Sequence, residues 1–158
     1  MGVARLWNVT AVVGLGFILS AAAPPDSQIA DAAMRGNSAT VRELIKQGFD
    51  VNAAQGDGMT ALHWAADRGD GGLTQMLIYA GADVEAFTRI GHYTPLHLAS
   101  RAGSEQAVRS LIRAGSNVAV RTSNSGATPL HLAAASGEPE VLSMLLEHGA
   151  DPNAREGE

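Results

Sequence analysis

The feature that most limits how this chain can fold is a four-residue motif that returns at a fixed spacing. The motif reads Thr-Ala-Leu-His once and Thr-Pro-Leu-His twice, and successive copies lie 34 residues apart. They begin at Thr60, Thr94 and Thr128. A second motif consists of Gly, a variable residue and Asp or Asn. Its four copies begin at Gly48, Gly81, Gly115 and Gly149, with spacings of 33, 34 and 34 residues. Two independent motifs with one period indicate a stack of similar structural units.

Each unit begins with the pattern of a short helix. The motif threonine can accept hydrogen bonds from free backbone amides at a helix N-terminus, and Pro95 and Pro129 follow at the first helical position, where a missing amide costs nothing. This helix carries Leu-His-Leu-Ala-Ala and ends at a glycine that can adopt a left-handed turn, namely Gly69, Gly103 or Gly137.

A second helix follows at once, with apolar residues at helical spacing, as in Val108, Leu111 and Ile112. A pair of such short helices cannot bury its own apolar face and must stack against neighbouring pairs. Abundant Ala, Leu and Gly and an aromatic content of only 4% favour thin helical layers. We therefore predict an all-α solenoid of stacked helix-turn-helix units.

These motifs closely resemble the ankyrin repeat family, whose pattern is Gly-x-Thr-Pro-Leu-His-x-Ala-Ala followed by Gly-His-x-x-Val-Val-x-x-Leu-Leu and Gly-Ala-Asp-Val-Asn. The resemblance runs from Ser27 to the end of the chain. It implies L-shaped units of two antiparallel helices and an outward hairpin loop, and a use in protein–protein binding. We predict an ankyrin repeat domain at residues 28–158, with units at about 28–54, 55–87, 88–121 and 122–154, and residues 155–158 as the start of a further unit.

The two ends of the array depart from the repeat pattern. The first unit has Ala30 in place of the motif histidine and Asp31 in place of an apolar residue, which would make the outer side of the first helix polar. We expect this degenerate unit to be an N-terminal cap. The last copy keeps Leu130 and Leu132, and no capping pattern follows it, so we expect the array to continue in a longer protein.

The loops also differ in length. The linkers from Gly81 to Thr94 and from Gly115 to Thr128 are one residue longer than the first linker. We expect their hairpins to bulge. In Gly91-His92-Tyr93 the loop glycine lies one place from the family position.

Residues 1–22 have the layout of a secretory signal peptide: Arg5, an apolar run at Val9–Leu19, and small residues at 20–23. We expect cleavage after Ala22, a short linker at residues 23–27, and export to the periplasm or the exterior of a bacterial cell. The alternative is an uncleaved membrane anchor, but about fifteen apolar residues fall short of the roughly 20 that span a bilayer. After cleavage we expect no membrane association.

Composition excludes several functions. The net charge is −5, and Arg5 is the only charged residue among the first 25, so the repeats lack the basic face that nucleic-acid binding needs. There is no Cys, hence no disulfide, thiolate nucleophile or Cys-ligated zinc.

The motif histidines His63, His97 and His131 invite a metal-site interpretation. They recur at one repeat position, however, and helix layers about 8 to 10 Å apart cannot bring three ligands to within about 2.1 Å of one ion. We expect each imidazole to link its threonine to nearby loop backbone, and we expect no metal or other cofactor.

The segment Asp67-Arg68-Gly69-Asp70 lacks the alternating ligands of a calcium loop, and we expect it to be the turn between two helices. Gly71 and Gly72 should weaken the helix that follows by roughly 1 to 2 kcal/mol in sum.

No catalytic motif is present, so we expect neither an enzyme nor a small-molecule substrate. A metal-dependent hydrolase is the least implausible catalytic alternative, and elemental analysis would test it.

We expect a protein partner of unknown identity on the concave face and loop tips. The candidate positions are those least tied to the repeat, and Tyr, Phe, Met and Arg are favoured as interface anchors. They are Asp57, Met59, Asp67, Arg68, Phe87, Arg89, Ile90, His92, Tyr93, Arg101, Arg121 and Asn124. Two alternatives stay open: Phe87 and Ile90 either anchor a partner or pack as local core under a neighbouring loop. Trp64 replaces a core Leu, which favours packing.

Overall fold

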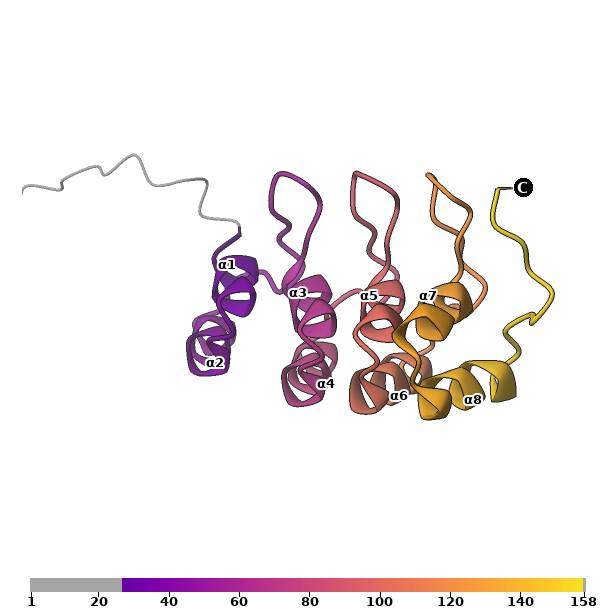
Figure 1. Cartoon of the computed structure of the whole chain (residues 1–158). Helices are drawn as coiled ribbons and strands as arrows, with labels where there is room; N and C mark the ends of the chain where they lie inside the picture. Colours follow the sequence, from indigo (N-terminus) through magenta and orange to yellow (C-terminus); the bar gives the residue numbers. More distant parts are fainter. Residues whose placement is uncertain (1–26, 158) are drawn as a thin grey trace, which may run out of the picture.

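The computed structural model describes residues 27–157, and over this range it contains eight α-helices and no β-strand. The helices form four pairs, which are α1 (Gln28–Met34) with α2 (Ser38–Lys46), α3 (Ala61–Asp67) with α4 (Gly71–Tyr79), α5 (Pro95–Arg101) with α6 (Glu105–Arg113), and α7 (Pro129–Ser136) with α8 (Pro139–Glu147). Figure 1 shows the first helices of the pairs in one row, the second helices in a row below, and hairpin loops rising above. The predicted all-α solenoid is confirmed.

The expected signal peptide at residues 1–22 and positions 23–26 of the linker lie outside the described residues. Among the helices of residues 27–157, none combines the length and the apolar character that crossing a membrane requires.

The first residue of each of these helices follows its N-cap residue directly. Pro95 and Pro129 are the first residues of α5 and α7, directly after the motif threonine. Side chains also cap the second helices of the first three pairs. Asp70 accepts a hydrogen bond from the amide of Leu73 at 2.9 Å, so the polar segment at 67–70 is the turn between α3 and α4.

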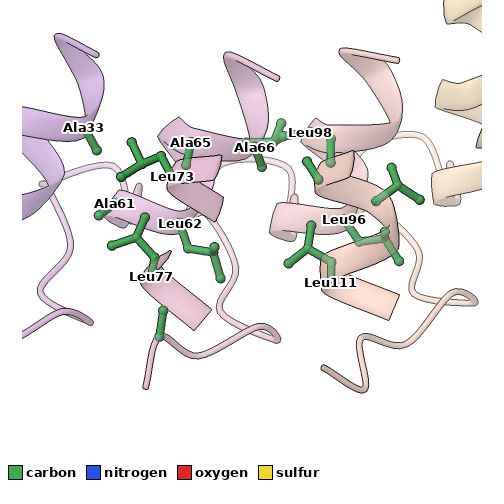
Figure 2. Packing of buried hydrophobic residues seen from close by; sticks show 14 of the residues in the cluster. Ala33, Ala61, Leu62, Ala65, Ala66, Leu73, Leu77, Leu96, Leu98 and Leu111 are labelled. Atoms are coloured by element: carbon green, nitrogen blue, oxygen red, sulfur yellow. The ribbon is translucent and has the colours of Figure 1, made fainter. Parts of the chain in front are cut away.

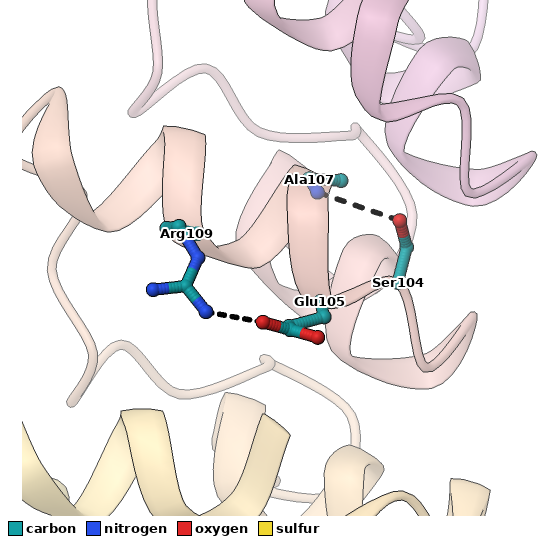
Figure 3. A network of polar contacts seen from close by, with 4 residues as sticks. All are labelled: Ser104, Glu105, Ala107 and Arg109. Carbon is teal, nitrogen blue, oxygen red and sulfur yellow. Dashed lines mark hydrogen bonds and ion pairs between the residues drawn. The ribbon is translucent and has the colours of Figure 1, made fainter. Parts of the chain in front are cut away.

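Figure 3 shows the corresponding cap of α6, where the Ser104 hydroxyl accepts from the amide of Ala107 at 3.4 Å. One turn along the same helix, Glu105 and Arg109 form an ion pair at i,i+4 spacing. Both side chains of the pair are about half-exposed, so the pair adds little to stability.

The core lies between successive helix pairs: the first helices contribute many alanines, and the second helices contribute larger side chains such as Leu77 and Leu111. Ala61, Leu62, Ala65 and Ala66 of α3 are fully buried, and so is Leu96 of α5. Figure 2 shows these residues between neighbouring helix layers. Because alanine lets the helices approach closely, each layer is thin and its burial depends on both neighbours.

The hairpin loops have two lengths, as expected. The first closes with the amide of Gln55 donating to the carbonyl of Met59 at 2.9 Å. In the next two, Thr88 donates to Tyr93 at 3.0 Å and Thr122 to Ala127 at 2.9 Å, so each encloses one more residue.

The second hairpin holds a non-glycine residue in the left-handed region. His92 has φ +52° and stands one residue before the closing carbonyl, where the other hairpins have Gly58 at φ +87° and Gly126 at φ +70°. Gly91 also has a positive φ of +82°. The shifted glycine therefore leaves a histidine in a backbone conformation that glycine tolerates better.

The hairpin tips are joined to one another by backbone hydrogen bonds. The amide of Arg89 donates to the carbonyl of Asp57 at 2.8 Å, and Ser123 donates to Gly91 at 3.0 Å. At the last tip, Gly157 donates to Ser125 at 2.7 Å. The tips thus form a continuous strip that fixes each loop relative to the next.

The first unit is less polar on its outer side than expected. Ala30 is fully buried, and Asp31 is half-buried. One oxygen of Asp31 accepts a hydrogen bond from Nε2 of Gln55, which belongs to the first hairpin, at 2.5 Å. Asp31 therefore ties the cap to the next unit.

Candidate partner-binding cleft

The hairpin loops and the first helices enclose a hollow on the concave face, which we call the concave cleft. It has a volume of about 290 Å³ and lies between the first two hairpins and helices α3 and α5. Nine residues line it, and six of them are among the positions expected to bind a partner. The six are Asp57, Met59, Asp67, Ile90, Tyr93 and Arg101; the other three are Trp64, Thr88 and Leu98.

The helix side of the cleft holds an ion pair between two units. Nη2 of Arg101 in α5 lies 2.5 Å from Oδ1 of Asp67 in α3. The side chain of Arg101 is 52% exposed and that of Asp67 is 31% exposed. The two opposite charges are paired, and the pair connects two successive helix layers, although its exposure keeps its contribution to stability small.

The aromatic lining is held in place by hydrogen bonds and ring contacts. Nε1 of Trp64 donates to Oε1 of Gln55 at 2.7 Å, and the Trp64 ring packs against the core. The ring of Tyr93 stands edge-on against His97 with centroids 5.9 Å apart, and its hydroxyl accepts from Nδ2 of Asn124 at 3.4 Å. Fixed rings of this kind lose little freedom when a partner binds.

Trp64 and Leu98 were not expected at the cleft because both occupy core positions of the repeat. Trp64 does pack, as its position favours, but it stays half-buried and also reaches the cleft. The one sequence signal was the replacement of the usual Leu by a larger ring. Because a tryptophan ring is larger than the leucine side chain of the other units, part of Trp64 extends from the core into the cleft.

Phe87 and Ile90 are exposed, so their packing as local core is excluded. Ile90 is 80% exposed and Phe87 is 58% exposed. Within residues 27–157 the one ring that contacts Phe87 is that of His92, and the two ring centroids lie 4.8 Å apart. Ile90 stands at the cleft rim, whereas Phe87 and His92 do not line the cleft.

Four other candidate positions use their polar groups to join units. Nη1 of Arg89 donates to the carbonyl of Gly56 at 2.8 Å, and Nη1 of Arg121 donates to the carbonyl of Arg155 at 2.8 Å. Arg68 reaches the carbonyl of Met34 at 3.4 Å, and Asn124 bonds Tyr93 as described. These side chains stabilise the stack, and none of the four lines the cleft.

Two of the motif histidines, His63 and His97, connect their units to the following hairpin. Nδ1 of His63 accepts from the amide of Thr60 at 3.2 Å and lies 2.8 Å from its hydroxyl, while Nε2 contacts the carbonyl of Tyr93 at 3.0 Å. Since an amide only donates and a carbonyl only accepts, the ring is neutral with its proton on Nε2. His97 makes the same contacts to Thr94 and to the carbonyl of Ala127.

Burial disfavours the charged form of these rings. Desolvation lowers the pKa of His63 and of His97 below the ordinary value of 6.5, although backbone carbonyls act in the opposite direction. Nδ1 of His131 makes the same contacts with Thr128. Across residues 27–157, no three His, Asp or Glu side chains gather closely enough to hold a metal ion.

The far end of the last unit carries a second, more apolar hollow of about 300 Å³. Leu130, His131 and Leu142 line it together with Leu146, which is 44% exposed. The corresponding faces of the inner units are covered by the next helix pair, so here an apolar stacking face lies open.

Two sequence models, both of ankyrin repeats, match this chain. The model of three copies matches residues 88–156, and the model of many copies matches residues 29–78. Together they cover most of the part that the structure describes.

Curated relatives are similar over single stretches. The mouse and human proteins named Ankyrin repeat domain-containing protein 40 are each 37% identical over 65 residues, which is 40% of this chain and 18% of theirs. Palmitoyltransferase AKR1 of Saccharomyces cerevisiae is 42% identical over 52 residues, 33% of this chain and 7% of its own. The chain thus spans less than a fifth of the length of these relatives.

Proposed function

Because the chain belongs to the ankyrin repeat family, we propose that it binds a specific partner protein on its concave face, with the concave cleft as the anchoring site. Ankyrin repeats generally mediate protein–protein interaction and are not enzymes as a class. The observation that carries the choice of site is Ile90, which is 80% exposed beside a cleft lined by Trp64 and Tyr93.

Ile90 lies in a loop that several hydrogen bonds hold in place. The hydroxyl of Thr88 donates to the carbonyl of Ile90 at 2.8 Å and accepts from the amide of Tyr93 at 3.0 Å. The neighbouring Arg89 is fixed to the first hairpin through both its amide and its guanidinium. Covering a large exposed apolar side chain with a partner removes it from water and makes the free energy of binding more favourable.

Affinity capture with two matched variants tests this site. Ile90→Glu places a charge at the cleft rim, and Tyr79→Glu places the same charge at the end of α4, where Tyr79 is 82% exposed. We expect Ile90→Glu to abolish capture of the partner from the host and Tyr79→Glu to leave it intact, with unchanged circular dichroism for both. Equal capture by the two variants contradicts the proposed site.

We further propose that residues 1–22 direct export to the periplasm or the cell exterior. The support is their sequence layout of one Arg, an apolar run and small residues. The mass of the protein purified from its host should match a chain that starts at Ala23. A protein that retains residues 1–22 and sediments with membranes would favour the anchored alternative.

A second candidate is a structural role within a longer ankyrin array whose activity lies elsewhere. The open apolar face of α7 and α8 favours it, because Leu146 and Leu142 would be covered by another unit. Nε2 of His131 also makes no hydrogen bond among the described residues, unlike that of His63. Codons for a further repeat after Glu158 would support this role, and a stop codon there would exclude it.

A further inference from the structure

The charge of the concave cleft is unbalanced. Asp67 and Arg101 pair with each other, so neither is left to attract a charged partner. Asp57 is exposed at the rim, and its Oδ1 accepts only the amide of Met59, at 2.9 Å. Within residues 27–157 no cation lies within ion-pair distance of Asp57. The cleft therefore presents one unpaired carboxylate.

The facing hairpin does not supply the missing cation. The guanidinium of Arg89 is bound to the carbonyl of Gly56, and Arg89 forms no ion pair in the part of the chain that is described. Arg101 is the only cation among the residues that line the cleft and it is paired with Asp67, so an acidic segment there would meet the unpaired carboxylate of Asp57. The charge pattern thus selects against acidic partners and in favour of basic ones.

The remaining lining is suited to an apolar group with a cation beside it. Ile90 and Met59 provide the aliphatic surface, since Leu98 is only 3% exposed. The rings of Trp64 and Tyr93 can bury apolar area and attract a cation to their faces. A volume of about 290 Å³ is at the small end for a binding pocket, which suits one large side chain of a peptide segment.

Building on the proposed function, we infer that the cleft takes a partner segment with one bulky aliphatic or aromatic side chain and, one to three positions away, a lysine or arginine that pairs with Asp57. The apolar side chain covers Ile90 and the aromatic lining. The basic side chain neutralises Asp57 while Arg101 stays paired with Asp67. Recognition combines a hydrophobic anchor with one charge, and the charge sets the orientation of the segment.

A library of randomised 12-residue peptides displayed on phage tests this chemistry directly on the full chain. We expect selected peptides to share a large apolar residue close to a Lys or Arg. The strongest peptide, synthesised with a fluorophore, should bind about three- to tenfold more weakly to Asp57→Asn and more weakly as salt rises. Asn keeps an oxygen that can accept from Met59, so the loop stays folded.

Glu140→Gln is the matched control, because it removes the same charge from the exposed first turn of α8. It should leave the affinity unchanged. Selected peptides that lack basic residues, an unaltered affinity for Asp57→Asn, or a library without binders would each overturn the inference.

The variant Ile90→Glu separates this failure from failure of the proposed function. If acidic or neutral peptides are selected and lose binding to Ile90→Glu, the docking site stands and only its charge preference is wrong. If the selected peptides bind Ile90→Glu as well as wild type, the concave cleft is not the docking site.

Discussion

At the scale of single residues, His63 and His97 combine a structural role with sensitivity to acid. Each ring accepts an amide hydrogen bond on Nδ1, and protonation there would remove that bond. Burial lowers both pKa values below the 6.5 of the unfolded chain. As the pH falls, the histidines of the unfolded chain therefore take up protons before those of the folded protein. The contribution of His63 and His97 to stability is full above pH 6.5 and decreases as the pH falls below that value.

We expect urea unfolding to show this loss between pH 7.5 and pH 5.5. At pH 5.5 each of the two histidines should have lowered the free energy of unfolding by up to about 1.4 kcal/mol. The double variant His63→Gln, His97→Gln should be less stable at both pH values but lose less between them. Equal losses for variant and wild type would show that other groups cause the dependence.

His92 tests the cost of a left-handed backbone. With φ +52°, it occupies a position that is glycine in the other two hairpins. His92→Gly should raise the free energy of unfolding by about 0.5 to 1 kcal/mol, because relief of strain exceeds the added freedom of the unfolded chain. Gly126→Ala, at the matching position, should lower it by about 1 kcal/mol. Thermal unfolding of both variants measures the difference, and a change of the same sign in both contradicts the strain argument.

At the scale of helices, α4 begins with two glycines that have different roles. A Cβ at Gly71 would lie 2.5 Å from Cβ of Gln106 in α6, whereas a Cβ at Gly72 would meet only an oxygen of Asp70 at 3.6 Å. The general expectation that both glycines merely weaken the helix is therefore incomplete for Gly71, which allows α4 and α6 to approach.

We expect Gly72→Ala to stabilise the protein by about 0.5 to 1 kcal/mol through helix propensity. Gly71→Ala should destabilise it, because the gain in propensity is smaller than the cost of overpacking, about 1 to 3 kcal/mol. Chemical denaturation of the two variants side by side gives the comparison. Stabilisation by Gly71→Ala would mean that Gln106 moves aside freely.

The helices themselves could be predicted because their signals are local. Thr94 and Pro95 determine where α5 begins, and the glycines with positive φ determine where the first helices end. Six of the nine residues that line the cleft are among the candidate positions, because the repeat pattern leaves those positions free. Their binding of a partner stays a prediction. Trp64 and Leu98 could not be assigned to it, because their exposure depends on how far the next layer covers them.

Two arginines show a second limit of prediction from sequence. Arginine is a residue type that often anchors interfaces, yet the guanidinium groups of Arg89 and Arg121 bind carbonyl oxygens of neighbouring loops. Such contacts join residues more than thirty positions apart, and a sequence pattern within one repeat does not reveal them.

At the scale of the whole molecule, the position of a unit in the stack should determine how much its core contributes. Leu96 and Leu130 occupy the same repeat position, but Leu96 is fully buried between two layers while Leu130 is half-buried at the open end. Leu96→Ala should cost about 2 to 5 kcal/mol, the range for a buried leucine. Leu130→Ala should cost clearly less, because it leaves no enclosed cavity. Urea unfolding measures both, and equal costs would show that the last unit is covered in solution.

The bonds from His63 and His97 to carbonyls thirty residues further along the chain have a consequence for biosynthesis. A ribosome makes His63 well before Tyr93, so the imidazole emerges into the cell without its acceptor. The units that carry His63 and His97 complete these contacts only when most of the next unit has been translated. Folding during synthesis must therefore trail the growing chain by one repeat, and a pause in translation would leave the newest unit as the vulnerable one.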